Sequence, residues 1–176
     1  MDYSILLICL LGCPVVAAAA MALLPAKATP RGLFEAIHVL SLAVVAVSGL
    51  WLVASVFAGS DLFALGGWFH LDGLGALFLG LIAVIAPATG LYSLPYVAHD
   101  VADGKLGPSQ VKQYYVFFSL FVFSMILAVT SNNIIMMWVS VEATTLSTSV
   151  PYISPKVPAA AAWTGAKLSA VIMSTK

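Results

Sequence analysis

Charged residues are scarce in this sequence. Only 8% of its 176 residues are Asp, Glu, Lys or Arg, whereas 62% are hydrophobic. Soluble domains have roughly 25% charged residues, so this chain has too few polar groups to cover a surface that faces water. The shortage excludes an ordinary soluble domain and indicates a protein of the lipid bilayer.

Basic clusters and metal-binding patterns are lacking as well. The formal net charge is zero, and no run of Lys or Arg supports a nucleic-acid partner. The two cysteines, Cys9 and Cys13, lie one helical turn apart in an apolar run, without the further ligands that a metal or haem site requires. We interpret them as small packing residues rather than a disulfide or a metal pair. With no nucleotide-binding loop either, we expect the chain to hold no cofactor.

Five apolar runs have about the length of 20 residues that a bilayer core of about 30 Å requires. They do not alternate with a period of two, which favours helices over a barrel. The expected fold is therefore an all-α, polytopic transmembrane protein with about five spans. The spans are residues 3–24, 36–58, 73–97, 114–130 and 132–150.

The first run could instead be a signal peptide, because its small residues suit a cleavage site. However, the start "MDYS" has no basic residue and the apolar run is longer than usual, so we favour a retained span. The basic residues then fall on alternate connections. The rule that such connections face the cytoplasm places the N-terminus outside. These residues are Lys27, Arg31, Lys105, Lys112 and, in the tail, Lys156, Lys167 and Lys176.

The connection at 59–72 has no basic residue and is amphipathic, with Trp68, Phe69 and His70. We expect it to lie at the membrane interface, with His70 as a surface hydrogen-bonding residue. Asp72 directly precedes the third span and is predicted to be its N-cap, in preference to a proton-handling role. Pro87 lies inside that span and should kink it.

Glu142 is the main candidate functional residue, because it lies in the fifth apolar run with no Lys or Arg within eight residues on either side. A carboxylate at the bilayer centre costs about 2.5–3.5 kcal/mol or more. Lipid favours the protonated form and a buried cation favours the ionised one, so a moving partner would make the group take up or release a proton. We predict a proton relay; the alternative is a protonated carboxyl that only packs.

Other polar residues are secondary candidates. Thr145 and Ser149 lie three to seven residues from Glu142, at helical spacing, and predict a hydroxyl-lined interior face. His38 lies about one turn into the second predicted span. It could carry a proton, although an interfacial histidine is the simpler interpretation.

Two stretches resemble a known family: "FHLDGLGALFLGLIAVIAPATGLYSLPYV" and "YYVFFSLFVFSMILAVTSNNIIMMWVSVEATTLST". They are similar to the antiporter-like proton-pumping subunits of respiratory complex I, of hydrogenase-4 type membrane hydrogenases and of multisubunit Na⁺/H⁺ antiporters. The stretches "MMWVSVEATTLST" and "AHDVADGKLGPSQVKQYY" look most like the hydrogenase-4 branch. The resemblance covers about residues 60–148.

The resemblance implies specific roles. Glu142 matches the essential glutamate of the family's fifth helix, which pairs with a lysine on a later helix. The chain would be a proton-translocating subunit of a multisubunit hydrogenase or NADH–quinone oxidoreductase in the bacterial inner membrane. Its partners would be other membrane subunits, redox-active peripheral subunits and lipid. A Na⁺/H⁺ antiporter subunit and a non-transporting assembly subunit are the alternatives.

The end of the chain departs from that family, whose members continue to about fourteen helices with inverted repeats. We divide the chain into the helical region 1–150 and an atypical tail, 151–176. The tail has three prolines in eight residues and then only a weakly apolar run. We expect it to reflect a truncated or frameshifted product, so Lys156 and Lys167 are not equated with the family's channel lysines.

Overall fold

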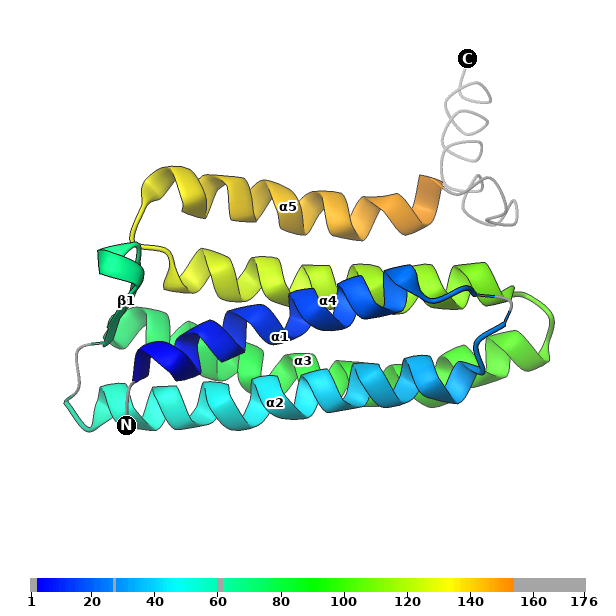
Figure 1. Ribbon diagram of the computed structural model, residues 1–176, viewed down its shortest axis with the longest axis horizontal. Coiled ribbons are helices and arrows are strands. Elements are labelled where there is room, and N and C mark those ends of the chain that lie inside the picture. The colour runs from blue at the N-terminus through cyan, green and yellow to red at the C-terminus, as the bar shows by residue number, and fades with distance from the viewer. Residues whose placement is uncertain (1–2, 27, 60–61, 154–176) are drawn as a thin grey trace, which may run out of the picture.

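The fold is a bundle of long helices that run alternately in opposite directions (Figure 1). The computed structural model describes residues 3–26, 28–59 and 62–153, with the side chains of residues 3, 4, 65 and 148–153 outside the description. Its helices are α1 (Tyr3–Leu23), α2 (Arg31–Phe57), α3 (Gly73–Ala102), α4 (Pro108–Thr130) and α5 (Ile134–Ile153). The first four are long and apolar enough to cross a bilayer, and Ile134–Ser147 is a shorter apolar helix. The expected all-α polytopic class is confirmed, and the chain is a multi-pass membrane protein.

The helices extend further at one end of the bundle than the apolar runs indicated. α2 begins at Arg31 rather than at residue 36, and α4 begins at Pro108 rather than at 114. Polar residues continue these helices beyond the apolar region, so hydropathy alone placed the boundaries too far inside. Pro108 suits the first turn of α4, where its missing N–H has no helical partner to lose.

The described basic residues gather at this same end. Lys112 Nζ donates hydrogen bonds to the carbonyl oxygens of Ala22 and Leu24, at 2.6 and 2.7 Å. These carbonyls lie at the end of α1, where helix carbonyls lack intrahelical partners. Arg31 donates to the carbonyl oxygen of Leu94 at 3.4 Å. Lys112 and Arg31 therefore join helices as well as marking one side of the bundle.

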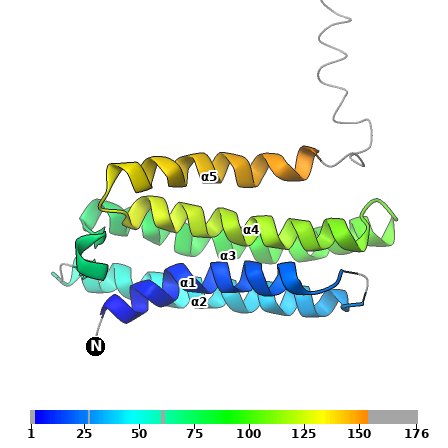
Figure 2. The same ribbon diagram turned by 45° about the horizontal axis from the view of Figure 1, so that its top comes forward.

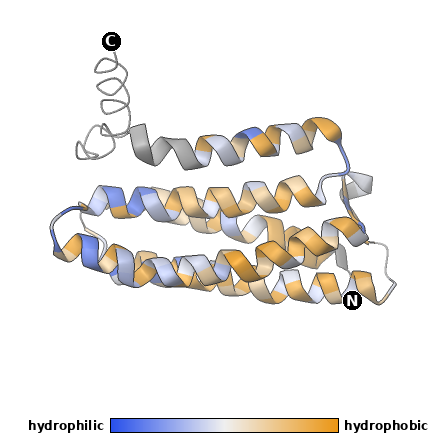
Figure 3. Cartoon of the chain, turned by 180° about the vertical axis from the view of Figure 1, so that it is seen from behind, coloured by the Kyte–Doolittle hydropathy of each residue, from blue (hydrophilic) through white to orange (hydrophobic). Residues whose placement is uncertain are grey.

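Lys105 lies in the connection between α3 and α4. Its Nζ is 2.8 Å from a carboxylate oxygen of Asp103 and 3.7 Å from one of Asp100. The hydrogen bond and the charge of Asp103 raise the pKa of Lys105. Figure 3 shows hydrophilic residues at the two ends of the bundle and hydrophobic residues along the middle of the helices.

The connection at 59–72 contains a β-hairpin, which the sequence analysis did not predict. β1 (Leu62–Ala64) pairs in antiparallel fashion with β2 (Phe69–Leu71), across a short 3₁₀ turn, Leu65–Gly67. Gly66 and Gly67 have positive φ angles of 67° and 89°, which glycine adopts without a steric cost.

One face of the hairpin packs into the bundle. Leu62, Ala64, Phe69 and Leu71 are buried, whereas the alternating residue Phe63 is exposed. His70 is half-buried and its ring stacks on Phe63, with ring centroids 4.2 Å apart. Period-two alternation over only three residues was too short to recognise as a strand, and the location of this segment at the membrane interface stays a prediction.

Small residues allow α2 and α3 to approach closely. A Cβ atom added to Gly49 would lie 2.9 Å from Cβ of Ala83, closer than real Cβ atoms approach one another. Such contacts are typical of helices packed in membranes, where lipid gives little hydrophobic drive for association. α3 runs through Pro87 as one helix and begins at Asp72, whose carboxylate accepts a hydrogen bond from the Gly75 amide at 2.7 Å.

α5 is the outermost helix and lies along α4, with α1, α2 and α3 on the other side of α4 (Figure 2). α4 therefore separates α5 from most of the buried hydrophobic core, which α1 to α4 and the hairpin form. One face of α5 is left uncovered by the described helices.

The orientation predicted from the basic residues can be tested with single cysteines in a background that carries Cys9→Ser and Cys13→Ser. In intact cells, a membrane-impermeant maleimide should label Trp68→Cys, because the hairpin lies at the outer end. Lys105→Cys should react only after the membrane is permeabilised. Val84→Cys, on the exposed face of α3, is the control and should stay unlabelled in hydrocarbon. The opposite pattern for the two ends would reverse the topology.

Candidate functional site

The start of α5 is fixed to the hairpin by an asparagine. The backbone amide of Asn132 donates to the Trp68 carbonyl at 3.0 Å, and its side-chain Nδ2 donates to the Gly67 carbonyl at 2.8 Å. Phe69 and Ser131 also form an isolated β-bridge. The turn between α4 and α5 is therefore attached to the connection between α2 and α3.

A second asparagine begins the helix itself. The side-chain Oδ1 of Asn133 accepts a hydrogen bond from the Ile135 amide at 2.8 Å, and its carbonyl accepts one from Met137 at 2.9 Å. This is N-cap geometry, which satisfies an amide that has no partner within the helix. The sequence analysis quoted these asparagines only within a resembling stretch. Asn132 contacts a residue 65 positions away, which no local pattern reports. Asn133 could have been found, because an asparagine directly before an apolar run is a helix-start signal.

Glu142 lies near the middle of α5, about 12 Å along the axis from Ile134 at a rise of about 1.5 Å per residue. Its side chain is exposed, and within the described part of the chain no side chain or backbone amide donates a hydrogen bond to its carboxylate. The described helices thus leave the charge without a partner.

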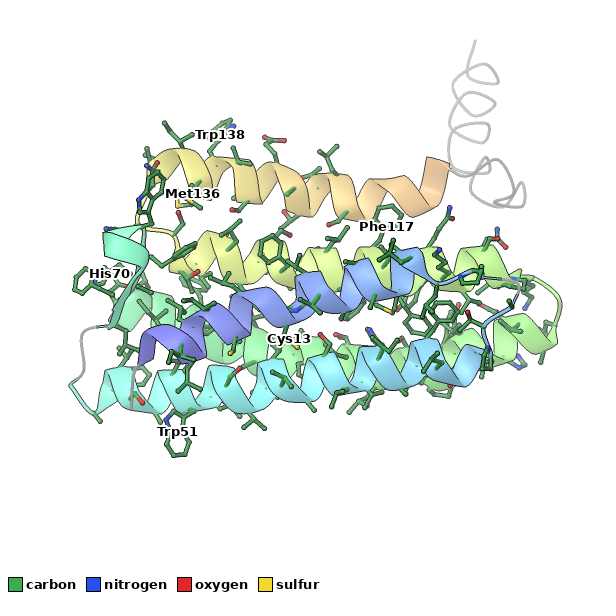
Figure 4. All side chains as sticks on the ribbon, viewed as in Figure 1. Cys13, Trp51, His70, Phe117, Met136 and Trp138 are labelled. Carbon is green, nitrogen blue, oxygen red and sulfur yellow. The ribbon has the colours of Figure 1, made fainter. Side chains whose placement is uncertain are left out.

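Large apolar side chains surround Glu142 on this face. Trp138, one turn earlier, is 68% exposed, and Leu146, one turn later, is 63% exposed. Trp138 points away from α4 (Figure 4). An ionisable group between two uncovered apolar residues is costly in hydrocarbon. The arrangement therefore requires a further polar partner on this face.

Two hydroxyl-bearing residues of α5 lie on a different face from Glu142. Ser140 and Ser147 are buried, and their Oγ atoms donate to the carbonyls of Met136 and Thr144 at 2.6 and 2.9 Å. Residues two positions apart on a helix are separated by roughly 200°, so Ser140 faces the bundle and Glu142 faces outward. Thr145 is exposed and lies three residues from Glu142, so it shares the outer face. The face that carries Glu142 and Thr145 is therefore not interior to the described helices, which corrects that part of the expectation.

The other secondary candidates on α5 have simpler roles. Thr145 is exposed, and its Oγ1 donates to the carbonyl of Val141 at 3.3 Å. Such bonds within one helix satisfy a hydroxyl in lipid. The side chain of Ser149 lies outside the described residues. Its predicted place in the relay stays a prediction.

His38 is fully buried rather than interfacial. Because α2 begins at Arg31, His38 lies about two turns into the helix, and its exposed fraction is 0%. Its ring lies against Tyr115 and Phe118 of α4, with centroids 4.9 Å away in each case. The interpretation as an exposed, interfacial histidine is corrected, because His38 lies on the face of α2 that packs into the bundle, together with Phe34 and Leu42.

Metal-ligating side chains do not cluster in this fold. Across residues 3–26, 28–59 and 62–153, no group of three or more His, Cys, Asp or Glu could hold a metal ion. Cys9 and Cys13 are free thiols, and Cys13 Sγ lies 3.7 Å from the hydroxyl of Ser41.

Comparisons with known proteins agree with the family resemblance. Over 83 residues, 47% of this chain, the sequence is 41% identical to a hydrogenase-4 component F homolog from Methylacidiphilum infernorum. It is 38% identical over 81 residues to the putative antiporter subunit mnhA2 of Staphylococcus saprophyticus. It is 30% identical over 74 residues to NADH-ubiquinone oxidoreductase chain 5 of Trichophyton rubrum. This chain is a homologue of antiporter-like membrane subunits.

The homologous stretch is a small part of these relatives. It amounts to 17% of the hydrogenase-4 component F homolog, 9% of the staphylococcal subunit and 10% of the fungal subunit. No family model matches the chain. The homology therefore identifies the kind of membrane subunit, while the activity of a whole subunit remains a matter for proposal.

Removal of the α5 cap should loosen the first turn of the helix that carries Glu142. Loss of an N-cap costs about 1 kcal/mol, so in Asn133→Ala the Ile135–Met137 amides should exchange hydrogen about fivefold faster. Hydrogen–deuterium exchange of the protein in lipid nanodiscs measures this change. Asn133→Ser keeps a capping oxygen and should exchange like the wild type. Equal exchange in the alanine variant would contradict the cap.

Proposed function

We propose that this chain is part of a proton-translocating membrane subunit of a multisubunit hydrogenase or NADH–quinone oxidoreductase, and that Glu142 carries the proton. The complex would lie in a bacterial inner membrane. Other membrane subunits would contact the chain, and redox-active peripheral subunits would hold the cofactors. The redox reaction would take place in those peripheral subunits.

The observation that carries this proposal is the exposed carboxylate in the middle of α5. A carboxylate left alone in hydrocarbon costs about 2.5–3.5 kcal/mol or more, and the described helices supply no donor for it. A partner on a further helix would stabilise the ionised form, and withdrawal of that partner would favour protonation. Alternation between these two states is the elementary step of a proton relay.

The fold around Glu142 suits this role because the start of the helix that carries it is held in place. Asn132 and Asn133 fix the start of α5 to the hairpin, while its hydroxyl groups bond within the helix. The carboxylate is thereby presented at a defined height on the outer face. A partner helix from the rest of the complex could approach that face without disturbing the packing of α1 to α4.

A cation/proton antiporter subunit is the second candidate. The 38% identity with a putative antiporter subunit favours it, and the same carboxylate would then serve exchange of ions without electron transfer. Neighbouring genes distinguish the two: hydrogenase or quinone-reductase subunits in one case and antiporter subunits in the other.

Glu142→Gln tests the relay, because glutamine keeps the size and hydrogen bonding of the side chain but cannot ionise. In the assembled complex, coupled proton translocation should fall by about 100-fold, the contribution typical of a positioned proton-transfer group. Proton uptake into inverted membrane vesicles measures the effect. Assembly of the complex, followed by native gel electrophoresis, should be unchanged.

The matched control is Asp103→Asn, which makes the same chemical change outside the membrane-spanning region. It should leave proton translocation intact. Normal pumping by Glu142→Gln would refute the relay and leave the role of a non-transporting assembly subunit. Loss of assembly in that variant alone would also identify Glu142 as a packing residue.

A further inference from the structure

Buried polar atoms without a partner occur at one place in the bundle. In the part of the chain that the structure describes, the buried side-chain nitrogen and oxygen atoms that lack a hydrogen bond are Nδ1 and Nε2 of His38 and the hydroxyl of Tyr115. Both residues are 0% exposed. A buried polar group without a hydrogen bond is costly, and an ordered water is the usual partner when no protein group is available.

These atoms lie together where α2, α3 and α4 meet. The rings of His38 and Tyr115 have centroids 4.9 Å apart. On the α3 side, a Cβ atom added to Gly90 would lie 3.1 Å from Nε2 of His38 and would overlap Leu42. Because Gly90 has no Cβ atom, the imidazole of His38 can lie directly against α3. Ser93 does not supply a donor, because its hydroxyl already bonds the Gly90 carbonyl at 2.7 Å.

Two charged side chains lie between this cluster and the basic end of the bundle. Arg31 and Glu35 form an ion pair on α2, with side chains 31% and 26% exposed. Glu35 precedes His38 by three residues, so the two lie on the same face of the helix. The hydroxyl of Tyr115 lies close to both Arg31 and Glu35, and Arg31 is near enough to act on it as a donor, yet no contact of this hydroxyl has full hydrogen-bond geometry. Polar groups at such a separation are commonly bridged by water.

Space for water exists next to this group. A cavity of about 160 Å³ is lined by Arg31, Phe34 and Val111, together with residues of the α1–α2 connection and of the adjoining ends of α3 and α4. Phe34 and Val111 lie one helical turn before His38 and Tyr115, respectively. At roughly 30 Å³ per molecule, the cavity has room for several waters, with Arg31 of the ion pair at its wall.

We propose that His38 and Tyr115 form a buried water-binding site between α2, α3 and α4, supplied with water from the end of the bundle where Arg31 pairs with Glu35. The ligand is water, held by the imidazole nitrogens and the phenol. The site is separate from Glu142, which lies on the outer face of α5, and the inference does not depend on the proposed function. It explains why a membrane helix carries a histidine at a position with no protein partner.

X-ray radiolysis of the 176-residue chain in lipid nanodiscs tests the site, because hydroxyl radicals formed from bound water oxidise the side chains next to it. Mass spectrometry of the peptides gives a rate for each residue. Tyr115 should be oxidised much faster than Phe69, which is similarly aromatic, is 8% exposed and lies in the hairpin, away from this cavity, and in H₂¹⁸O Tyr115 should incorporate ¹⁸O. A Tyr115 rate as low as that of Phe69 would overturn the proposal.

A matched pair of variants identifies the group that holds the water. His38→Leu fills a similar volume without polar atoms and should reduce oxidation of Tyr115 to the Phe69 rate. His38→Gln keeps a donor and an acceptor and should largely retain it. Ser124→Ala is the control on α4, because its hydroxyl bonds only within its helix, and it should change nothing. Undiminished oxidation in a folded His38→Leu variant would contradict the assignment.

A measurement on the unmodified protein covers the case in which His38→Leu fails to fold. In water-edited solid-state NMR of ¹⁵N-histidine-labelled chain, magnetisation from water should reach the ring nitrogens of His38. The three histidines are distinguished by His70→Asn and His99→Asn. No transfer to His38, with clear transfer to the exposed His99, would show a dry site and refute the proposal.

Discussion

Lipid offers no hydrogen bonds, and this constraint explains most of the polar contacts in the structure. Every amide, carbonyl and hydroxyl within the hydrocarbon must find a partner in the protein. The serine and threonine hydroxyls of α2, α4 and α5 do so within their own helices, as Ser119 does with the Tyr115 carbonyl at 3.0 Å. Helix ends are satisfied by side chains from elsewhere: Lys112 at the end of α1, Asp72 at the start of α3 and Asn133 at the start of α5.

Two places in the described chain do not meet this constraint, and they are the places where we propose function. Glu142 has no partner on the outer face of α5, whereas His38 and Tyr115 have none in the interior. The two sites can gain a hydrogen-bond partner in different ways. An outward carboxylate can gain a partner from another helix of a larger complex, while a closed interior site admits only a molecule as small as water.

The β-hairpin connects these features mechanically. Its buried face packs on the core, and its turn accepts the hydrogen bonds of Asn132. It thereby sets the height at which α5 starts, although α5 itself packs mainly against α4. Because the first turn of α5 depends on this attachment, the position of Glu142 along the membrane normal follows from contacts made outside the hydrocarbon.

The sequence by itself determined the membrane class, the alternating order of the helices and the identity of Glu142 as an unusual residue. Those properties follow from composition, the length of apolar runs and the cost of a charge in lipid, which are all local. Only the tertiary structure decided which way each side chain faces. Glu142 points outward and Ser140 inward because residues two positions apart on a helix face nearly opposite directions. His38 is buried because it lies on the face of α2 that packs into the bundle. The partners of Asn132 and Lys112 lie 65 and 88–90 residues away in the chain. No periodicity reports contacts between segments so distant, since they arise only when the helices pack.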